Sequence, residues 1–393
     1  MSGRAEVRRG SKGRRAVGLL LCTGLLAGVS ARPIAAQTAT DEPPKLKFYG
    51  DFRLRSESDW DSMQSDGTLR TDRDRLRVRL RVGFTYAYDA HINFGARIRS
   101  GNPQDQQSPH QSLGDEFESK PFNIDKAFLQ GTWGKGWVWA GKNSFPFWTQ
   151  NELFWDDDVN PEGIAGGFSF PLGKSKQRLK PTLGYFIMDT SSPSTSNRYS
   201  EKSHMAALQV AWEMTFQPVD LTAAAGLYSF DDNPATTDTA LADLDYDIYV
   251  GGIKAAFKKG PKPWSVGVDF MKNDHTYPST LFNADQKTGY VLGLNLGALK
   301  QKKDWLVGYY YAHIEKFALV ARLAQDDWLR WGSGTDTRSS NFEGHELRLA
   351  YAFGPSWNIM LRVFKVEGIE LESATAVAKE DGKRARLDLN IAF

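Results

Sequence analysis

Apolar and polar residues alternate along residues 75–88, which read RLRVRLRVGFTYAY. A period of two predicts a β-strand, because successive side chains of a strand point to opposite faces. One face of this strand is suited to hydrocarbon, and the other must contact water or anions. An edge strand of a soluble sheet would show the same pattern, so the rest of the chain has to decide. Arginine occupies the first four positions of the polar face: Arg75, Arg77, Arg79 and Arg81.

The same period recurs along the chain and predicts about sixteen strands, an even number that suits an outer-membrane barrel. Most are apolar on one face, as in a barrel whose outside contacts lipid and whose inside is wet. Beyond the N-terminal region, no apolar run reaches about eighteen residues, so no membrane-spanning helix is expected. The predicted strands cover 45–57, 72–88, 91–99, 122–134, 136–142, 162–171, 178–190, 203–216, 219–230, 245–258, 263–271, 287–299, 304–316, 341–353, 356–368 and 383–393.

Short connections, such as Asp89-Ala90 and Gly354-Pro355, alternate with long ones read as polar links. Outer-membrane barrels require this alternation, because their periplasmic turns are short and their extracellular loops are long. The expected fold is therefore all-β, a single transmembrane antiparallel barrel over residues 45–393 with both termini on the periplasmic side. The long connections cover 58–71, 100–121, 143–161, 190–202, 231–244, 272–286, 317–340 and 369–382.

Aromatic residues gather beside the short connections, where girdles at the bilayer interface are expected. Examples are Tyr88, Trp133, Trp264 and Trp357. The chain ends RLDLNIAF, an alternating strand closed by Phe393. This ending resembles the C-terminal signature of bacterial outer-membrane proteins that the barrel assembly machinery reads, so that machinery is an expected partner.

The first residues predict export. A basic stretch precedes an apolar run at 16–29 and small residues up to Ala36, the order of a secretory signal peptide. We expect removal of residues 1–36, with cleavage after Ala31 as the alternative, and a short periplasmic segment at 37–44. Removal takes away seven basic residues and one acid, so the net charge changes from +2 to −4 and gives nucleic-acid binding no support. Cys22, the only cysteine, leaves with the signal, so no disulfide or thiolate metal site is expected.

Four stretches resemble the putative porin family of Gram-negative bacteria. They are GDFRLRSE at 50–57, DRLRVRLRVG at 74–83, the segment from Ser100 to Ala127, and LFWDDDVNPEG at 153–163. The resemblance covers nearly all of the chain beyond residue 36. Arginine-ladder hairpins of this kind also occur in alginate-export and phosphate-selective barrels. The resemblance implies passive solute diffusion across the outer membrane by a homotrimer.

The polar faces of four predicted strands are expected to form one basic wall. A barrel of about sixteen strands leaves an aqueous channel, so its inward residues set its selectivity. An arginine on the lipid side would cost about 2–4 kcal/mol at the bilayer midplane, so the arginines are expected to face inward. Barrel closure brings the last strand beside the first. The expected pore-lining residues are Arg53, Arg55, Arg75, Arg77, Arg79, Arg81, Arg97, Arg99, Arg384 and Arg386.

The third long connection, 143–161, is the expected constriction. It holds five aromatic residues between Phe145 and Trp155, which are poorly suited to water, and in trimeric porins the third loop folds inward. Four acids would then face the arginine wall across a narrow pore, where the field filters ions. The alternatives are a solvated turn and a Ca²⁺ site, since clustered carboxylates can bind that ion. The acids are Glu152, Asp156, Asp157 and Asp158.

The sequence thus predicts a porin for small hydrophilic solutes, with a preference for anions. The alternatives are a specific channel or exporter for an anionic solute (phosphate or a uronate polymer) and a structural barrel or adhesin. No catalytic group is expected: Ser203 and His204 are adjacent on a strand and point to opposite faces. No cofactor is expected either, and lipid of the outer membrane is the expected surrounding.

Overall fold

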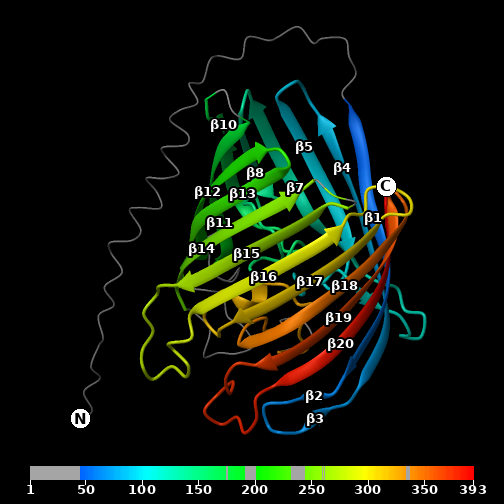
Figure 1. Ribbon diagram of the computed structural model, residues 1–393, viewed down its shortest axis with the longest axis vertical. Helices are drawn as coiled ribbons and strands as arrows, with labels where there is room; N and C mark the ends of the chain where they lie inside the picture. The colour runs from blue at the N-terminus through cyan, green and yellow to red at the C-terminus, as the bar shows by residue number, and fades with distance from the viewer. Residues whose placement is uncertain are drawn as a thin grey trace. The chain divides into compact units, whose positions relative to one another are not determined.

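The computed structural model describes residues 45–173, 176–190, 201–231, 244–258, 260, 262–332 and 337–393. The predicted signal peptide and the segment 37–44 lie outside the described residues, as do most of the connections 190–202 and 231–244. Within the described part, antiparallel strands form a closed barrel of 16 strands, as predicted (Figure 1).

The barrel strands follow one another around the wall in chain order. The strands of the first half are β1 (Leu46–Trp60), β4 (Arg73–Ala87), β5 (Ile92–Ser100), β7 (Phe122–Trp133), β8 (Gly136–Lys142), β9 (Glu162–Phe168) continued by β10 (Phe170–Pro171), β11 (Gln177–Thr190) and β12 (Glu201–Phe216). Those of the second half are β13 (Val219–Asp231), β14 (Tyr246–Phe257), β15 (Trp264–Asn273), β16 (Thr288–Gly297), β17 (Trp305–Ile314), β18 (Phe342–Gly354), β19 (Trp357–Gly368) and β20 (Asp381–Ala392). Every predicted strand is present, with boundaries shifted by a few residues.

Three further strands are short and belong to the long connections. The pair β2 (Ser62–Met63) and β3 (Leu69–Arg70) forms a separate hairpin between β1 and β4. The strand β6 (Gln111–Ser112) pairs with β4 between β5 and β7. Within the described residues, no helix has the length and hydropathy needed to cross a bilayer.

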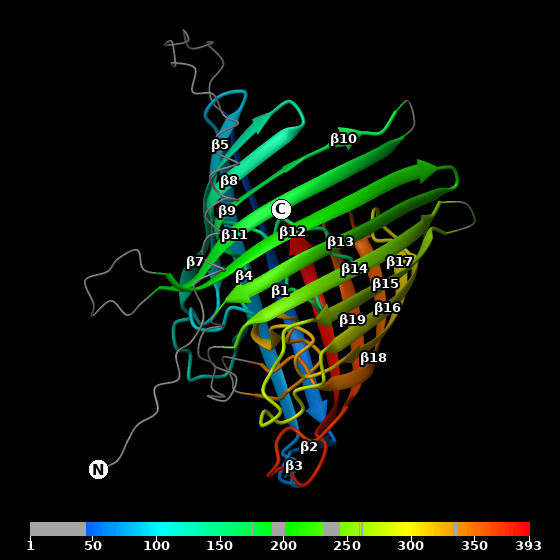
Figure 2. The ribbon, with the colours of Figure 1, turned by 90° about the vertical axis from the view of Figure 1, so that its left-hand side faces the viewer.

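The two ends of the described chain meet at the seam where β1 pairs with β20. Blue β1 lies beside red β20 in both views (Figures 1 and 2). Gly50 and Phe393 exchange two backbone hydrogen bonds, of 2.9 and 3.0 Å. A Cβ atom on Gly50 would lie 2.4 Å from the carbonyl oxygen of Arg81 and 2.5 Å from the Phe393 ring. Glycine therefore permits the close approach that seals the barrel.

Large apolar side chains lie outside the barrel, and arginines lie inside. On β4, Leu76 is 47% exposed and Arg77 is 7% exposed; on β20, Leu387 is 45% exposed and Arg386 is 1% exposed. A soluble sheet shows the reverse distribution, whereas an outer-membrane barrel presents an apolar band to lipid. The alternative of a soluble edge strand is therefore wrong.

The connection between β17 and β18 corrects one prediction. Residues 317–340 were expected to form a polar loop, but Phe317, Leu319 and Trp328 are almost completely buried. The 3₁₀ helix η2 (Ala321–Leu323) lies within this connection. Apolar side chains that find neither lipid nor another domain can leave water only by entering the barrel, where they meet inward-facing side chains.

Candidate functional site

Three adjacent strands, β4, β1 and β20, align their side chains, nearly all of them polar, in five rows across the inner wall. The rows are Arg81–Asp51–Ala392, Arg79–Arg53–Asn390, Arg77–Arg55–Asp388, Arg75–Glu57–Arg386 and Arg73–Asp59–Arg384. The neighbouring strand β5 adds Arg97 and Arg99, and Arg99 pairs in register with Arg81. Strand pairing thus brings all ten predicted arginines onto one surface, where each is buried or half-buried. We call this surface, including Arg73, the arginine wall.

Carboxylates are interleaved with the arginine wall. In the five rows, nine arginines meet four carboxylates. Asp388 accepts two hydrogen bonds from Arg55, of 2.7 and 2.9 Å, in the bidentate geometry that orients a guanidinium. Glu57 contacts Arg75 and lies 2.7 Å from Arg386. The wall is therefore an ordered ion-pair network with an excess of positive charge.

Sequence reasoning missed these acids as part of the site. Glu57 and Asp59 continue the odd-numbered face of β1 that carries Arg53 and Arg55. The signal was the same alternation: the predicted strand ended at Glu57 and so excluded Asp59, and Glu57 itself was not counted among the pore-lining residues. Asp388 lies two residues beyond Arg386 on the same face, so the period of two also contained it.

Aromatic side chains anchor the loop 143–161 to the barrel wall. The Phe145 and Trp155 rings stack with centroids 4.2 Å apart, and the Phe147 and Phe154 rings lie 5.2 and 4.9 Å from that of Tyr228 on β13. These contacts bury the apolar part of the loop.

Hydrogen bonds fix the same loop to two further strands. Gln209 on β12 accepts from the Trp148 backbone N–H at 2.7 Å and donates to the Trp148 carbonyl at 2.9 Å. Gln150 donates to Asp269 on β15 at 2.7 Å. The loop is thus held on one side by β12, β13 and β15.

At its other end, the loop reaches the arginine wall. The Asp158 carboxylate lies 2.6 Å from Arg81 and 3.7 Å from Arg79. Burial opposes ionisation of Asp158, but these two guanidinium groups outweigh it and hold the pKa of Asp158 below its ordinary value. The acids were expected to face the arginines across an open gap, and for Asp158 the distance shows direct contact instead.

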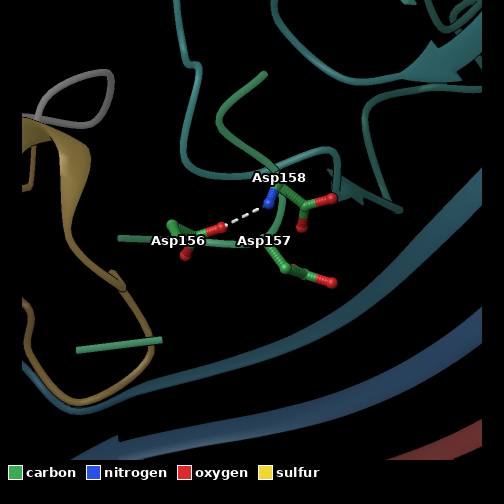
Figure 3. A group of neighbouring side chains, drawn as sticks. All are labelled: Asp156, Asp157 and Asp158. Atoms are coloured by element: carbon green, nitrogen blue, oxygen red, sulfur yellow. Dashed lines mark hydrogen bonds between the residues drawn. The ribbon is translucent and has the colours of Figure 1, made fainter. Parts of the chain in front are cut away.

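The three consecutive aspartates point in different directions (Figure 3). An Asp156 oxygen accepts the backbone N–H of Asp158 at 2.7 Å. Burial, and then the charge of Asp158, raise the pKa of Asp156 well above its ordinary value. Asp156 and Asp158 are 3% and 7% exposed, so the solvated turn is wrong for both. Asp157 remains exposed.

The donor set of a cation site is only partly present here. Ligand atoms of Asp156, Asp157 and Asp158 lie within 4.8 Å of one another. However, Arg81 and Arg79 already neutralise Asp158. Ion pairing with arginine thus accounts for Asp158, and the three ligand atoms of the cluster are fewer than the six to eight oxygens that Ca²⁺ prefers.

The connection between β17 and β18 supplies a further acid that sequence reasoning did not identify. Asp327 contacts Arg386 and Arg362 and lies 3.4 Å from Arg55. Its neighbour Trp328 is held between aromatic rings of β18 and β19. The apolar content of this connection was the available signal, since its sequence from 317 reads FALVARLAQDDWLRW.

Three long connections contact one another inside the barrel. The backbone N–H of Asp156 donates to the Leu323 carbonyl at 2.8 Å, and Gln107 donates to the Ala324 carbonyl at 2.7 Å. Gln325 hydrogen-bonds Glu152. Burial, and then the charge of Asp157, raise the pKa of Glu152 to about 7. These contacts bring acids from two loops to the same part of the arginine wall.

Comparison with known proteins agrees with the fold. The model of a family described as putative porin matches residues 66–259. No curated protein matches the sequence significantly. The Pseudomonas putida OprB structure at high pH is similar, with a TM-score of 0.55 and 14% identity over 88% of this chain and 94% of that one. A trimer form of OmpT, an outer membrane protein of Vibrio cholerae, has a TM-score of 0.50 and 12% identity over 90% of this chain and all of that one.

The two solved structures share too little sequence identity with this chain to show more than its fold. The family match confirms the resemblance found in the sequence. The match covers residues from the β1–β4 connection to the end of β14, and thus includes the loop 143–161 and part of the arginine wall. Residues 66–259 of this chain therefore resemble the putative porin family, and they lie within a barrel that has the fold of outer-membrane porins.

Proposed function

We propose that this protein is an outer-membrane porin through which small hydrophilic solutes diffuse, with a preference for anions. The observation that carries the proposal is the inverted distribution of side chains on a closed barrel. Apolar residues such as Leu76 and Leu387 are exposed, while arginines such as Arg77 and Arg386 line the interior. The match to the putative porin family and the barrel fold support an outer-membrane channel.

The anion preference follows from the charge of the inner wall. The five rows of β4, β1 and β20 hold nine arginines and four carboxylates side by side, which leaves an excess of positive charge. The row with Arg79, Arg53 and Asn390 contains no carboxylate, and Asp158 of the loop 143–161 contacts its edge. We therefore assign the pore lining to the arginine wall and the constriction to Glu152 and Asp156–Asp158, with the described part of the connection between β17 and β18 as a second narrowing element.

A second candidate is a channel specific for one anionic solute. The burial of Arg55 and Arg386 among fixed acid partners favours it, because an ordered network can recognise a ligand, whereas a wide pore only attracts ions. A channel of either kind needs no cofactor and performs no catalysis.

The assembly of the protein is part of the same proposal. Export by a cleaved signal peptide at residues 1–36 and insertion by the barrel assembly machinery, which reads the strand ending in Phe393, would place the barrel in the outer membrane of a Gram-negative bacterium. A homotrimer is supported by the trimer form of the similar OmpT. Ala225 and Leu227 on β13 face outward and offer an apolar surface for such contacts.

Conductance of the purified protein in a planar bilayer tests the proposal. A porin gives stepwise, ohmic channels, and a KCl gradient gives a reversal potential of the sign for chloride preference. Replacing Arg77, Arg79 and Arg81 together with alanine should reduce that potential toward zero. Absence of conductance from correctly folded protein would contradict the porin, and unchanged selectivity of the triple variant would contradict the role of the wall.

A further inference from the structure

A cavity of about 440 Å³ lies at the end of the barrel that carries the long connections. This volume is within the range of small-molecule sites. Its walls come from β4, β20 and three long connections. Two carboxylates line it, Asp105 and Asp326. Seven arginines line it: Arg70, Arg73, Arg75, Arg77, Arg330, Arg384 and Arg386.

The acids that pair with these arginines lie behind them. Glu57 and Asp59 are 1% and 3% exposed, and neither they nor Asp327 and Glu380 line the cavity. Their charges hold the guanidinium groups in place, and an ion that enters the cavity meets the guanidinium groups first. A planar guanidinium presents paired donors that match the oxygens of carboxylate and phosphate.

Two of the lining arginines have donor capacity that the protein does not use. Arg77 is 7% exposed, and its Nε has no hydrogen-bond partner within the described residues. Arg330 donates to the Thr71 carbonyl at 2.9 Å, and none of the described acids forms an ion pair with it. The Arg330 guanidinium has no carboxylate partner among the described residues, so its charge is available to an anion that enters the cavity.

One lining acid loses much of its charge near neutral pH. Burial, and then the charge of Asp326, raise the pKa of Asp105 to about 7. The protonated carboxyl repels an anion less and can donate a hydrogen bond to it.

We propose that this cavity binds a small oxyanion, whose charge is carried by phosphate or carboxylate oxygens, ahead of its passage through the barrel. This inference rests on the proposed channel and specifies its solute class. None of the described lining residues is aromatic, which disfavours stacking of a sugar ring. The volume suits a small ion better than a uronate polymer.

Equilibrium binding to the folded protein in detergent tests the inference without any need for conductance. Inorganic phosphate and succinate are titrated separately by calorimetry at low salt. Saturable binding of one ion per barrel is expected in at least one arm, and the arm that gives the tighter binding identifies the anionic group. If both arms show no saturable binding while the protein conducts, the inference fails and the porin stands. If the protein binds the ion but does not conduct, the binding site stands and the porin proposal fails.

Two substitutions locate the site. Arg330→Gln removes a guanidinium that pairs with none of the described carboxylates, and Arg70→Gln leaves Glu380 paired with Arg338. Each should weaken binding about tenfold, the loss expected for one charge-assisted hydrogen bond. Lys379→Gln is the matched control, because Lys379 is on a neighbouring long connection and does not line the cavity. This variant should bind the oxyanion with wild-type affinity. Equal affinity of all three variants would place the ion elsewhere and overturn the inference.

Discussion

Asp158 of the inward loop contacts Arg81 of the barrel wall, with 2.6 Å between Oδ1 and Nη1. The same carboxylate lies 3.7 Å from Arg79. The contact joins a loop anchored on β12, β13 and β15 to a strand across the interior, so it sets both the position of the loop and the charge that remains on the wall.

Asp158→Asn should therefore increase the anion preference. The substitution keeps the shape of the side chain and removes the negative charge that neutralises Arg81 and Arg79. One unit charge about 4 Å from a passing ion is worth about 1 kcal/mol in water, so the anion-to-cation permeability ratio should rise a few-fold. The reversal potential in a KCl gradient measures it. Asp115→Asn, on an exposed loop position, is the control and should leave the ratio unchanged.

Arg53→Gln should have the opposite effect. Arg53 lies opposite Arg79 in the row that contains no carboxylate. Its nearest acid, Asp388 at 3.8 Å, keeps Arg55 as partner, so the substitution leaves no buried acid unpaired. The permeability ratio should fall a few-fold for the same Coulombic reason. An unchanged ratio, with Lys258→Gln measured beside it, would mean that ions do not pass this row.

Selectivity should also depend on pH near neutrality. Burial, and then the charge of Asp157, raise the pKa of Glu152 to about 7, so the carboxyl is mostly neutral at pH 6 and mostly charged at pH 8. The anion preference should accordingly be greater at pH 6 than at pH 8. Glu152→Gln fixes the neutral form and should remove the part of this change that comes from Glu152, leaving that of Asp105. If the variant has the same pH profile as wild type, Glu152 does not face the ion path.

The sequence predicted the barrel well because the strand signal is local. Alternation and the parity of loop lengths follow from the pleat and from barrel geometry, and both can be read along the chain. Closure placed Arg384 and Arg386 near Arg53 and Arg55 for the same reason. The acidic partners Asp59 and Asp388 lie on the same strand faces as these arginines. They were missed because only the basic residues on those faces were considered.

The packing of the long connections could not be predicted in the same way. Asp327 reaches Arg55, Arg362 and Arg386 only because the loop after β17 enters the barrel. Such contacts depend on the space that the other loops leave inside, which no local pattern encodes. The apolar residues around Trp328 indicate burial, but they do not indicate against which strand.

Trp328→Ala should loosen the second inward loop without opening the barrel. Trp328 packs between Phe342 and Phe364, with centroids 5.8 and 5.7 Å away, and truncation of a buried tryptophan costs about 3–5 kcal/mol. Single-channel conductance should increase, and the loop should become sensitive to protease. Trp328→Phe is the matched control, because the indole N–H has no hydrogen-bond partner within the described residues and only ring size changes. Conductance equal to wild type in the alanine variant would exclude this loop as a narrowing element.

Phe393→Ala should reduce assembly in the outer membrane more than it reduces stability. The backbone of Phe393 still pairs with Gly50 after the substitution, so the seam retains its hydrogen bonds. Ile391→Ala is the matched control: Ile391 lies on the same outer face of β20 and is 38% exposed, so it loses similar apolar contact. The heat-modifiable folded fraction in isolated outer membranes should fall for Phe393→Ala alone, while both variants refold into detergent like wild type. Equal assembly of the two variants would mean that the terminal phenylalanine contributes packing and not recognition by the assembly machinery.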